Sequence, residues 1–161
     1  ELFAVPSGLR EHLDFHERSL LATANQLLGN EWALGAQYRL SHAELKSRFV
    51  DVPTSVATPQ DVDALLHQLN LNVIFNHPSG FFAVGEAVWY AQTSNGYTPA
   101  LADEDFWQFN AFVGYRFFRR KATVSLGVLN ISDQDYNLNP LNLYNEPPRE
   151  RTLAVRLDLN F

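Results

Sequence analysis

The stretch RTLAVRLDLNF, residues 151–161, alternates strictly between two kinds of side chain. Every second position carries a bulky apolar residue: Leu153, Val155, Leu157, Leu159 and Phe161. The positions between them are polar or small: Thr152, Ala154, Arg156, Asp158 and Asn160. Because successive side chains of a strand point to opposite faces of a sheet, this pattern predicts a β-strand with one apolar and one polar face.

The same alternation recurs along the chain. It is regular over residues 32–41, 66–76, 106–117 and 122–130, and less regular over residues 19–28 and 81–92. Together with the last stretch, this predicts an all-β protein of about seven antiparallel strands. Strands of about nine residues or more are long enough to cross a bilayer when they are tilted.

The connections between these strands alternate in length. Short turns at residues 29–30, 76–80 and 118–121 are separated by long polar segments at 41–64, 93–105 and 132–148. This asymmetry is typical of an outer-membrane β-barrel, with short periplasmic turns and long extracellular loops. We therefore predict that residues 19–161 are the C-terminal strands of an antiparallel transmembrane β-barrel. Residues 1–18 are predicted to be a loop or strand extension entering it.

The polar positions carry amides, hydroxyls and glycines with only isolated charges, which favours a barrel lumen over a freely solvated surface. The lumen-facing candidates are Arg39, Glu86, Arg116, Arg156 and Asp158, which either form a charge ladder across the strands or brace the wall. Aromatic residues make up 13% of the chain and gather at predicted strand ends. The candidates for an aromatic girdle at the water–lipid interfaces are Trp32, Trp89, Trp107, Tyr115 and Phe117.

Several function classes are disfavoured. A net charge of −6 argues against a nucleic-acid binder. The sequence contains no run of about 18 apolar residues, so we expect no transmembrane helix. The chain has no Cys and no recognisable nucleophile, phosphate-binding or zinc-protease motif, so we expect neither an enzyme nor a cofactor. Two patterns resemble metal sites. The first is His12, Asp14 and His16, for which a solvated strand is the better interpretation. The second is Asp133, Asp135, Asn137 and Asn139, which start like a calcium loop but are better interpreted as an Asx-rich turn.

The last thirty-odd residues resemble the carboxyl terminus of large Gram-negative outer-membrane barrels, the TonB-dependent receptors above all. Such termini have Asn-Leu-Phe-Asp-x-x-Tyr after a strand, then a loop, a Pro-Gly-Arg-like turn and a last strand ending in Phe. The matching residues are Asn130, Ile131, Asp133, Tyr136, Pro148, Arg149 and Phe161, and Ser132 replaces an aromatic residue. Similar termini occur on barrels fused to periplasmic helical-repeat domains.

The resemblance implies a bacterial outer-membrane location, with membrane lipid and lipopolysaccharide as neighbours. It also implies that the barrel-assembly machinery reads the terminal strand, through Phe161, Leu159, Leu157 and Val155. Barrels of this kind usually have an even number of strands. We therefore expect further N-terminal strands or domains of the same protein to complete the wall.

Three functions stay open at this point. The first is the wall of a porin-like or receptor-like barrel that transports a solute or polymer across the outer membrane. The second is a closed-lumen outer-membrane barrel that acts in binding or structure through its extracellular loops. The third is a soluble lipocalin-like β-barrel whose apolar side chains point inward and bind a small apolar ligand.

Overall fold

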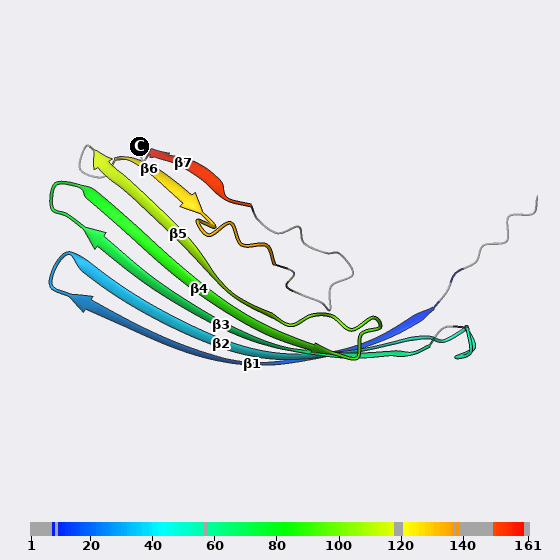
Figure 1. Cartoon of the computed structure of the whole chain (residues 1–161). Helices are drawn as coiled ribbons and strands as arrows, with labels where there is room; N and C mark the ends of the chain where they lie inside the picture. The colour runs from blue at the N-terminus through cyan, green and yellow to red at the C-terminus, as the bar shows by residue number, and fades with distance from the viewer. Residues whose placement is uncertain are drawn as a thin grey trace, which may run out of the picture.

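Residues 8, 10–56, 58–117, 121–136, 138 and 150–159 are described by the computed structural model of the protein. They form one sheet of seven antiparallel strands, in which each strand pairs with the next one in the chain (Figure 1). The strands are β1 (Glu11–Leu28), β2 (Trp32–Phe49), β3 (Gln60–Asn76), β4 (Phe81–Asn95), β5 (Glu104–Phe117), β6 (Ala122–Leu129) and β7 (Thr152–Leu159).

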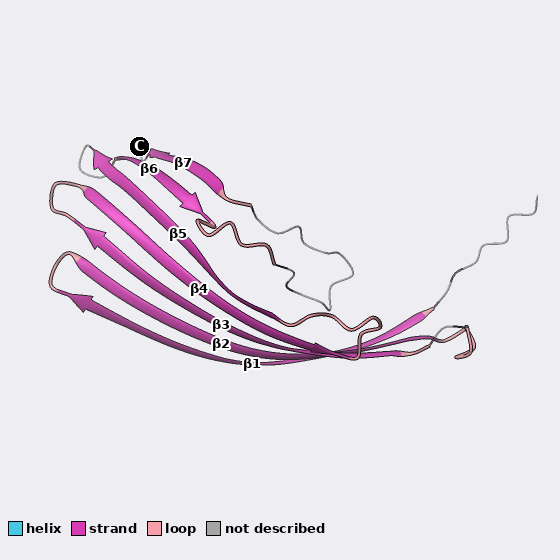
Figure 2. Cartoon of the chain, viewed as in Figure 1, coloured by secondary structure: helices cyan, strands magenta, loops and turns pink. Residues whose placement is uncertain are grey.

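The prediction of an all-β antiparallel protein is confirmed (Figure 2). Among the described residues, there is no helix long and apolar enough to span a membrane. The sheet is not closed into a barrel, because the two edge strands β1 and β7 do not contact each other in the described part of the chain. Barrel closure and membrane insertion therefore remain predictions.

The strands extend further than the sequence pattern predicts. The expected loop at 41–64 is largely strand, since β2 continues to Phe49 and β3 begins at Gln60. The predicted boundary between residues 18 and 19 falls inside β1. Cross-strand charge pairs accompany this extension, for example Lys46 with Asp61 at 3.5 Å. Such pairs stabilise an antiparallel ladder. The few apolar residues of this region, such as Leu45 and Val62, lie on the other face from those of the inner strands, which is why the pattern did not predict the extension.

The two ends of the sheet differ. The connections β1–β2 and β3–β4 are short and lie together at one end, while β2–β3 and β4–β5 are longer and lie at the other (Figure 1). Gly29 and Gly80 have φ angles of 64° and 103°, a left-handed conformation that glycine adopts without strain. We call these the short-turn end and the long-loop end. Residues 118–120 of the third expected turn lie outside the described residues.

The register divides the strand side chains into two faces. The amide face contains the cross-strand row Asn25, Gly35, Asn72, Glu86 and Asn110, and the apolar face contains the neighbouring row Ala24, Ala36, Leu71, Ala87 and Phe109. The buried strand residues all lie on the amide face: Ser41, Val62, Ala64, Phe82, Val88, Gln92, Phe106, Gln108, Asn110, Ser125 and Gly127. Side chains converge on the concave side of a bent sheet, so this burial identifies the amide face as the concave one.

Candidate functional site

The apolar face is an exposed surface, and most of it carries no charge. From the cross-strand row of Ala22, Tyr38, Leu69, Trp89 and Trp107 to the short-turn end, none of its residues on the seven strands is Asp, Glu, Lys or Arg. Its large side chains are open to the surroundings, with Leu153 82% and Leu126 55% exposed. An apolar patch that covers a whole sheet far exceeds what a soluble monomer usually exposes, and it indicates contact with a membrane or another protein.

Two rows of rings bound this face. At the short-turn end, Trp32 packs on Phe75 at 4.7 Å, Phe75 on Phe81 at 6.3 Å, and Tyr115 on Phe117 at 4.7 Å between ring centroids. Towards the long-loop end, the rings of Tyr38, His67, Trp89, Trp107 and Phe109 follow one another at 6.2–6.4 Å. The five girdle candidates from the sequence all belong to these rows.

The spacing of the two rows suits a bilayer. Trp107 and Tyr115 belong to different rows and lie eight positions apart on β5. At about 3.3 Å per residue, this is about 26 Å along the strand, or about 20 Å across the membrane for a strand tilted by about 40°. The apolar band of an outer-membrane barrel is about 25 Å tall. Polar tips also point away from the band, since Trp89 Nε1 donates to Asp105 Oδ1 at 2.7 Å.

The five lumen-facing candidates share the amide face, but they do not form one ladder of charges. Arg39 lies 3.4 Å from Glu17, and Arg156 pairs with Asp158 on its own strand at 2.9 Å. Arg116 donates to Asn76 Oδ1 at 2.8 Å and lies 4.2 Å over the ring of Phe82. Among the described residues, Glu86 makes no ion pair. The charges therefore make separate local contacts on the sheet.

Glu86 is held by amides from both neighbouring strands. Asn70 Nδ2 donates to Oε1 and Asn110 Nδ2 donates to Oε2, each at 2.8 Å. The side-chain oxygen Oδ1 of Asn110 in turn accepts a hydrogen bond from the backbone N–H of Asn130 at 2.9 Å. These hydrogen bonds fix the Glu86 carboxylate on the concave face and connect it to the end of β6. The sequence signal was the amide content of the polar positions, but the pairing of these amides required the strand register.

Rings also fill part of the concave face. A Cβ atom at Gly114 would meet the ring of Phe82, and one at Gly127 would meet the ring of Phe112. The two phenylalanines therefore lie flat over glycines of the adjacent strand, an arrangement that lets a sheet bend sharply. The sequence placed these rings on a polar face, and it did not predict that glycine makes room for them.

The polarity of the faces reverses where the strands pass the long-loop row of rings. Beyond Leu40, the continuation of the apolar face carries charged and histidine side chains: His12, Asp14, His16, Arg18, His42, Glu44, Lys46, Arg48, Asp61 and Asp63. The continuation of the amide face is apolar at Leu13, Phe15, Leu45, Val62 and Ala64. The long strands therefore consist of two parts in which the same face has opposite polarity.

Three ionisable groups near this end have shifted pKa values. The hydrogen bond from Arg10 lowers the pKa of Asp51, and the same contact raises the pKa of Arg10, with Nη2 to Oδ1 at 2.8 Å. Burial raises the pKa of Tyr97, whose hydroxyl is buried and has no hydrogen-bond partner among the described residues. No pattern in the sequence pointed to Tyr97, because its burial depends on the fold of the loop after β4.

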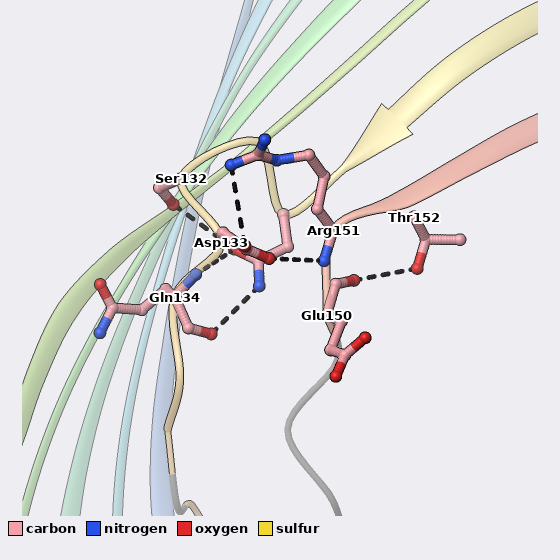
Figure 3. A network of polar contacts seen from close by, with 7 residues as sticks. Ser132, Asp133, Gln134, Glu150, Arg151 and Thr152 are labelled. Carbon is pink, nitrogen blue, oxygen red and sulfur yellow. Dashed lines mark hydrogen bonds and ion pairs between the residues drawn. The ribbon is translucent and has the colours of Figure 1, made fainter.

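The segment after β6 forms a compact turn that reaches the start of β7 (Figure 3). The fully buried Asn130 accepts the backbone N–H of Gln134 at 3.0 Å and donates to its carbonyl oxygen at 3.1 Å. Asp133 accepts the backbone N–H of Arg151 at 2.9 Å. The ring of Tyr136 stacks on Phe106 at 5.0 Å between centroids. The residues that matched the barrel termini therefore connect β5, β6 and β7.

The terminal strand has the predicted faces. Val155, Leu157 and Leu159 lie on the apolar face, and Phe161 lies outside the described residues, as do Pro148 and Arg149. Within the described part of the chain, no group of three or more His, Asp or Glu side chains is arranged to hold a metal ion, and the chain has no Cys. The pair His16 and Asp14, 3.1 Å apart, is an exposed contact on β1.

The comparisons with known proteins return no relative. The chain matches no protein-family model, no curated protein and no solved structure.

Proposed function

We propose that this chain forms part of the wall of a β-barrel in a bacterial outer membrane, and that the barrel passes a solute or polymer. The observation that carries the proposal is the exposed apolar face, uncharged across all seven strands between two rows of rings. In hydrocarbon, a sheet must have no unpaired edge, so β1 and β7 would pair with further strands of the same protein. The concave amide face would then line the lumen.

The direction of bending separates this proposal from a soluble lipocalin-like barrel. A barrel that binds an apolar ligand in water needs its apolar side chains on the concave side. Here the buried positions of β5 are Phe106, Gln108 and Asn110, whereas Trp107, Phe109 and Val113 are exposed. This burial supports a polar interior and an apolar exterior, as in outer-membrane barrels that have water-filled lumens.

A closed-lumen barrel is the second candidate. Phe82, Phe106 and Phe112 all lie on the concave face, and rings in a lumen reduce the space left for a solute. Such a barrel would act through its long loops, in binding or structure. Its wall would have the same apolar exterior, so the contents of the lumen decide between the two candidates.

Adjacent positions on β3 test all three functions. Because these 161 residues contain no Cys, Leu71→Cys or Asn72→Cys adds one attachment site for a spin label on the apolar or the amide face of the chain. Any Cys elsewhere in the full protein is replaced by Ser in both variants. In lipid vesicles, we measure collisions of each label with oxygen, which concentrates in lipid, and with a water-soluble nickel complex.

We expect oxygen collisions at position 71 and nickel collisions at position 72. If the nickel complex reaches neither position while oxygen reaches position 71, the lumen is closed and the second candidate replaces the first. If the protein stays in plain buffer, with position 71 shielded from both reagents, the soluble barrel replaces both.

A further inference from the structure

A polar pocket lies on the amide face of β1, β2 and β3. Its volume is about 270 Å³, and it is lined by Ser19, Leu21, Gln37, Arg39, Gln68 and Asn70. This volume is close to the lower limit of pockets that bind small molecules, so it accommodates one small group rather than an extended ligand. The pocket lies on the longest strands, whose register fixes the spacing of its side chains.

The lining presents hydrogen-bonding groups that the protein itself leaves available. Among the described residues, the carboxamides of Gln37 and Gln68 have no hydrogen-bond partner. Asn70 uses one N–H on Glu86, which leaves its carbonyl oxygen as an acceptor. A carboxamide both donates and accepts, and so does a hydroxyl group. Adjacent carboxamides therefore match a solute that carries several neighbouring hydroxyls.

A row of rings continues from this pocket across the amide face. Gln68 pairs with Tyr90, which pairs with Phe106 on the next strand. The Tyr90 and Phe106 rings are 5.2 Å apart, and Tyr136 stacks on Phe106, which is buried; Tyr90 is only partly buried and is the ring that a ligand can reach. Rings combine an apolar body with, in tyrosine, a polar edge, so they suit a solute with both C–H surfaces and hydroxyls.

Resting on the proposed function, we propose that this row of amides and rings binds a neutral, hydroxyl-rich solute of the oligosaccharide class. The pocket receives one sugar ring, and Tyr90 supports the next. The charges at the site argue against an anionic solute, because the guanidinium of Arg39, the one charged group of the lining, is shared with Glu17, and Asn70 of the lining is bonded to the carboxylate of Glu86. A purely apolar solute would leave the carboxamides unsatisfied, which costs free energy.

The test uses the full-length protein, refolded and purified in detergent, and calorimetric titration with maltohexaose and isomaltohexaose as probes. Polyethylene glycol of matched mass and an acidic hexasaccharide are the comparison solutes. We expect saturable binding of at least one neutral hexasaccharide and none of polyethylene glycol. The double variant Gln37→Leu and Gln68→Leu should weaken this binding about tenfold, since it removes hydrogen bonds to two carboxamides.

Gln26→Leu is the matched control, because Gln26 lies on the apolar face of the same sheet and donates only to the adjacent backbone carbonyl of Leu27. It should leave hexasaccharide affinity unchanged. The Gln37→Asn and Gln68→Asn double variant keeps the polarity but withdraws both amides, and it replaces the leucine variant if that protein does not fold.

The outcomes separate this inference from the proposed function. If the protein inserts into vesicles but binds neither neutral hexasaccharide, the solute class is wrong and the barrel wall stands. Binding of the acidic hexasaccharide alone would also overturn the neutral class. An equal loss of affinity in Gln26→Leu would remove the pocket from the site. Failure to insert into vesicles would refute the proposed function itself.

Discussion

A single arginine at the centre of the apolar face should destabilise the protein strongly, and at the edge of that face only weakly. Ala111 lies on β5, four positions from Trp107 and four from Tyr115. This places it about 13 Å along the strand from each row of rings. Its cross-strand neighbours are Gly85 and Val128, so a longer side chain meets little steric resistance. Arg at this position therefore reports the surrounding medium rather than packing.

The expected cost follows from depth in the bilayer. Arg at the midplane of an outer-membrane barrel costs about 2–4 kcal/mol, and near an interface about 0–1 kcal/mol. Ala111→Arg should thus lower the folding equilibrium constant about 30-fold to 1000-fold. Ala122→Arg is the matched control, because Ala122 is on the same face but pairs with Phe117 and Leu159 at the short-turn end. It should lose less than tenfold.

The assay is reversible guanidinium unfolding of the full-length protein in lipid vesicles, followed by tryptophan fluorescence. Equal costs for Ala111→Arg and Ala122→Arg would contradict the proposed position of the bilayer. The proposed membrane location would also be refuted if the wild-type protein showed the same unfolding transition in plain buffer as in lipid vesicles.

Three further predictions concern the loops. Asn130→Ala should cost about 2–4 kcal/mol in unfolding experiments, because it removes the hydrogen bonds of a buried side chain to Gln134 and Ser132 and places Ala at φ 50°. Asn130→Gly should recover about 1 kcal/mol, and equal losses in the two variants would show that backbone conformation contributes nothing. Tyr97→Phe should leave the unfolding midpoint unchanged or raise it, since the removed hydroxyl is buried without a partner in the described structure. A lower midpoint would show that the Tyr97 hydroxyl makes a stabilising hydrogen bond. The hydrogen bond from Arg10 should lower the pKa of Asp51 below its ordinary value, which carboxyl NMR measures. The pair therefore stabilises the fold above the ordinary pKa, and this stability is lost as the pH falls through the lowered pKa. Arg10→Gln should return the pKa of Asp51 to its ordinary value, and an unchanged pKa would contradict the pairing.

The sequence predicted the parts of the fold that follow from local alternation. Trp107 to Phe117 could only form a strand with one ring-rich apolar face and one mixed face, and the structure confirms those faces. Residues 1–18 were predicted to be a loop or strand extension, and the outer half of β2 was missed. In that half the apolar residues change face, as at Leu45, and charged residues such as Lys46 take the alternate positions, so the pattern indicates a polar loop. The sequence left open whether Glu86, Arg116, Arg156 and Asp158 form a ladder or brace the sheet. In the structure, Glu86 is held by amides of the two adjacent strands, and Arg116 donates to Asn76 on β3.

By itself, the sequence determined that the chain is a set of two-faced strands with unequal connections, because side-chain period and turn residues are local properties of the backbone. Only the tertiary structure decided which face is concave, which amides meet at Glu86, and how Asn130 and Asp133 connect the last strands. These features depend on register and on the bending of the sheet. Both are set by pairing between distant segments, and no local pattern encodes them.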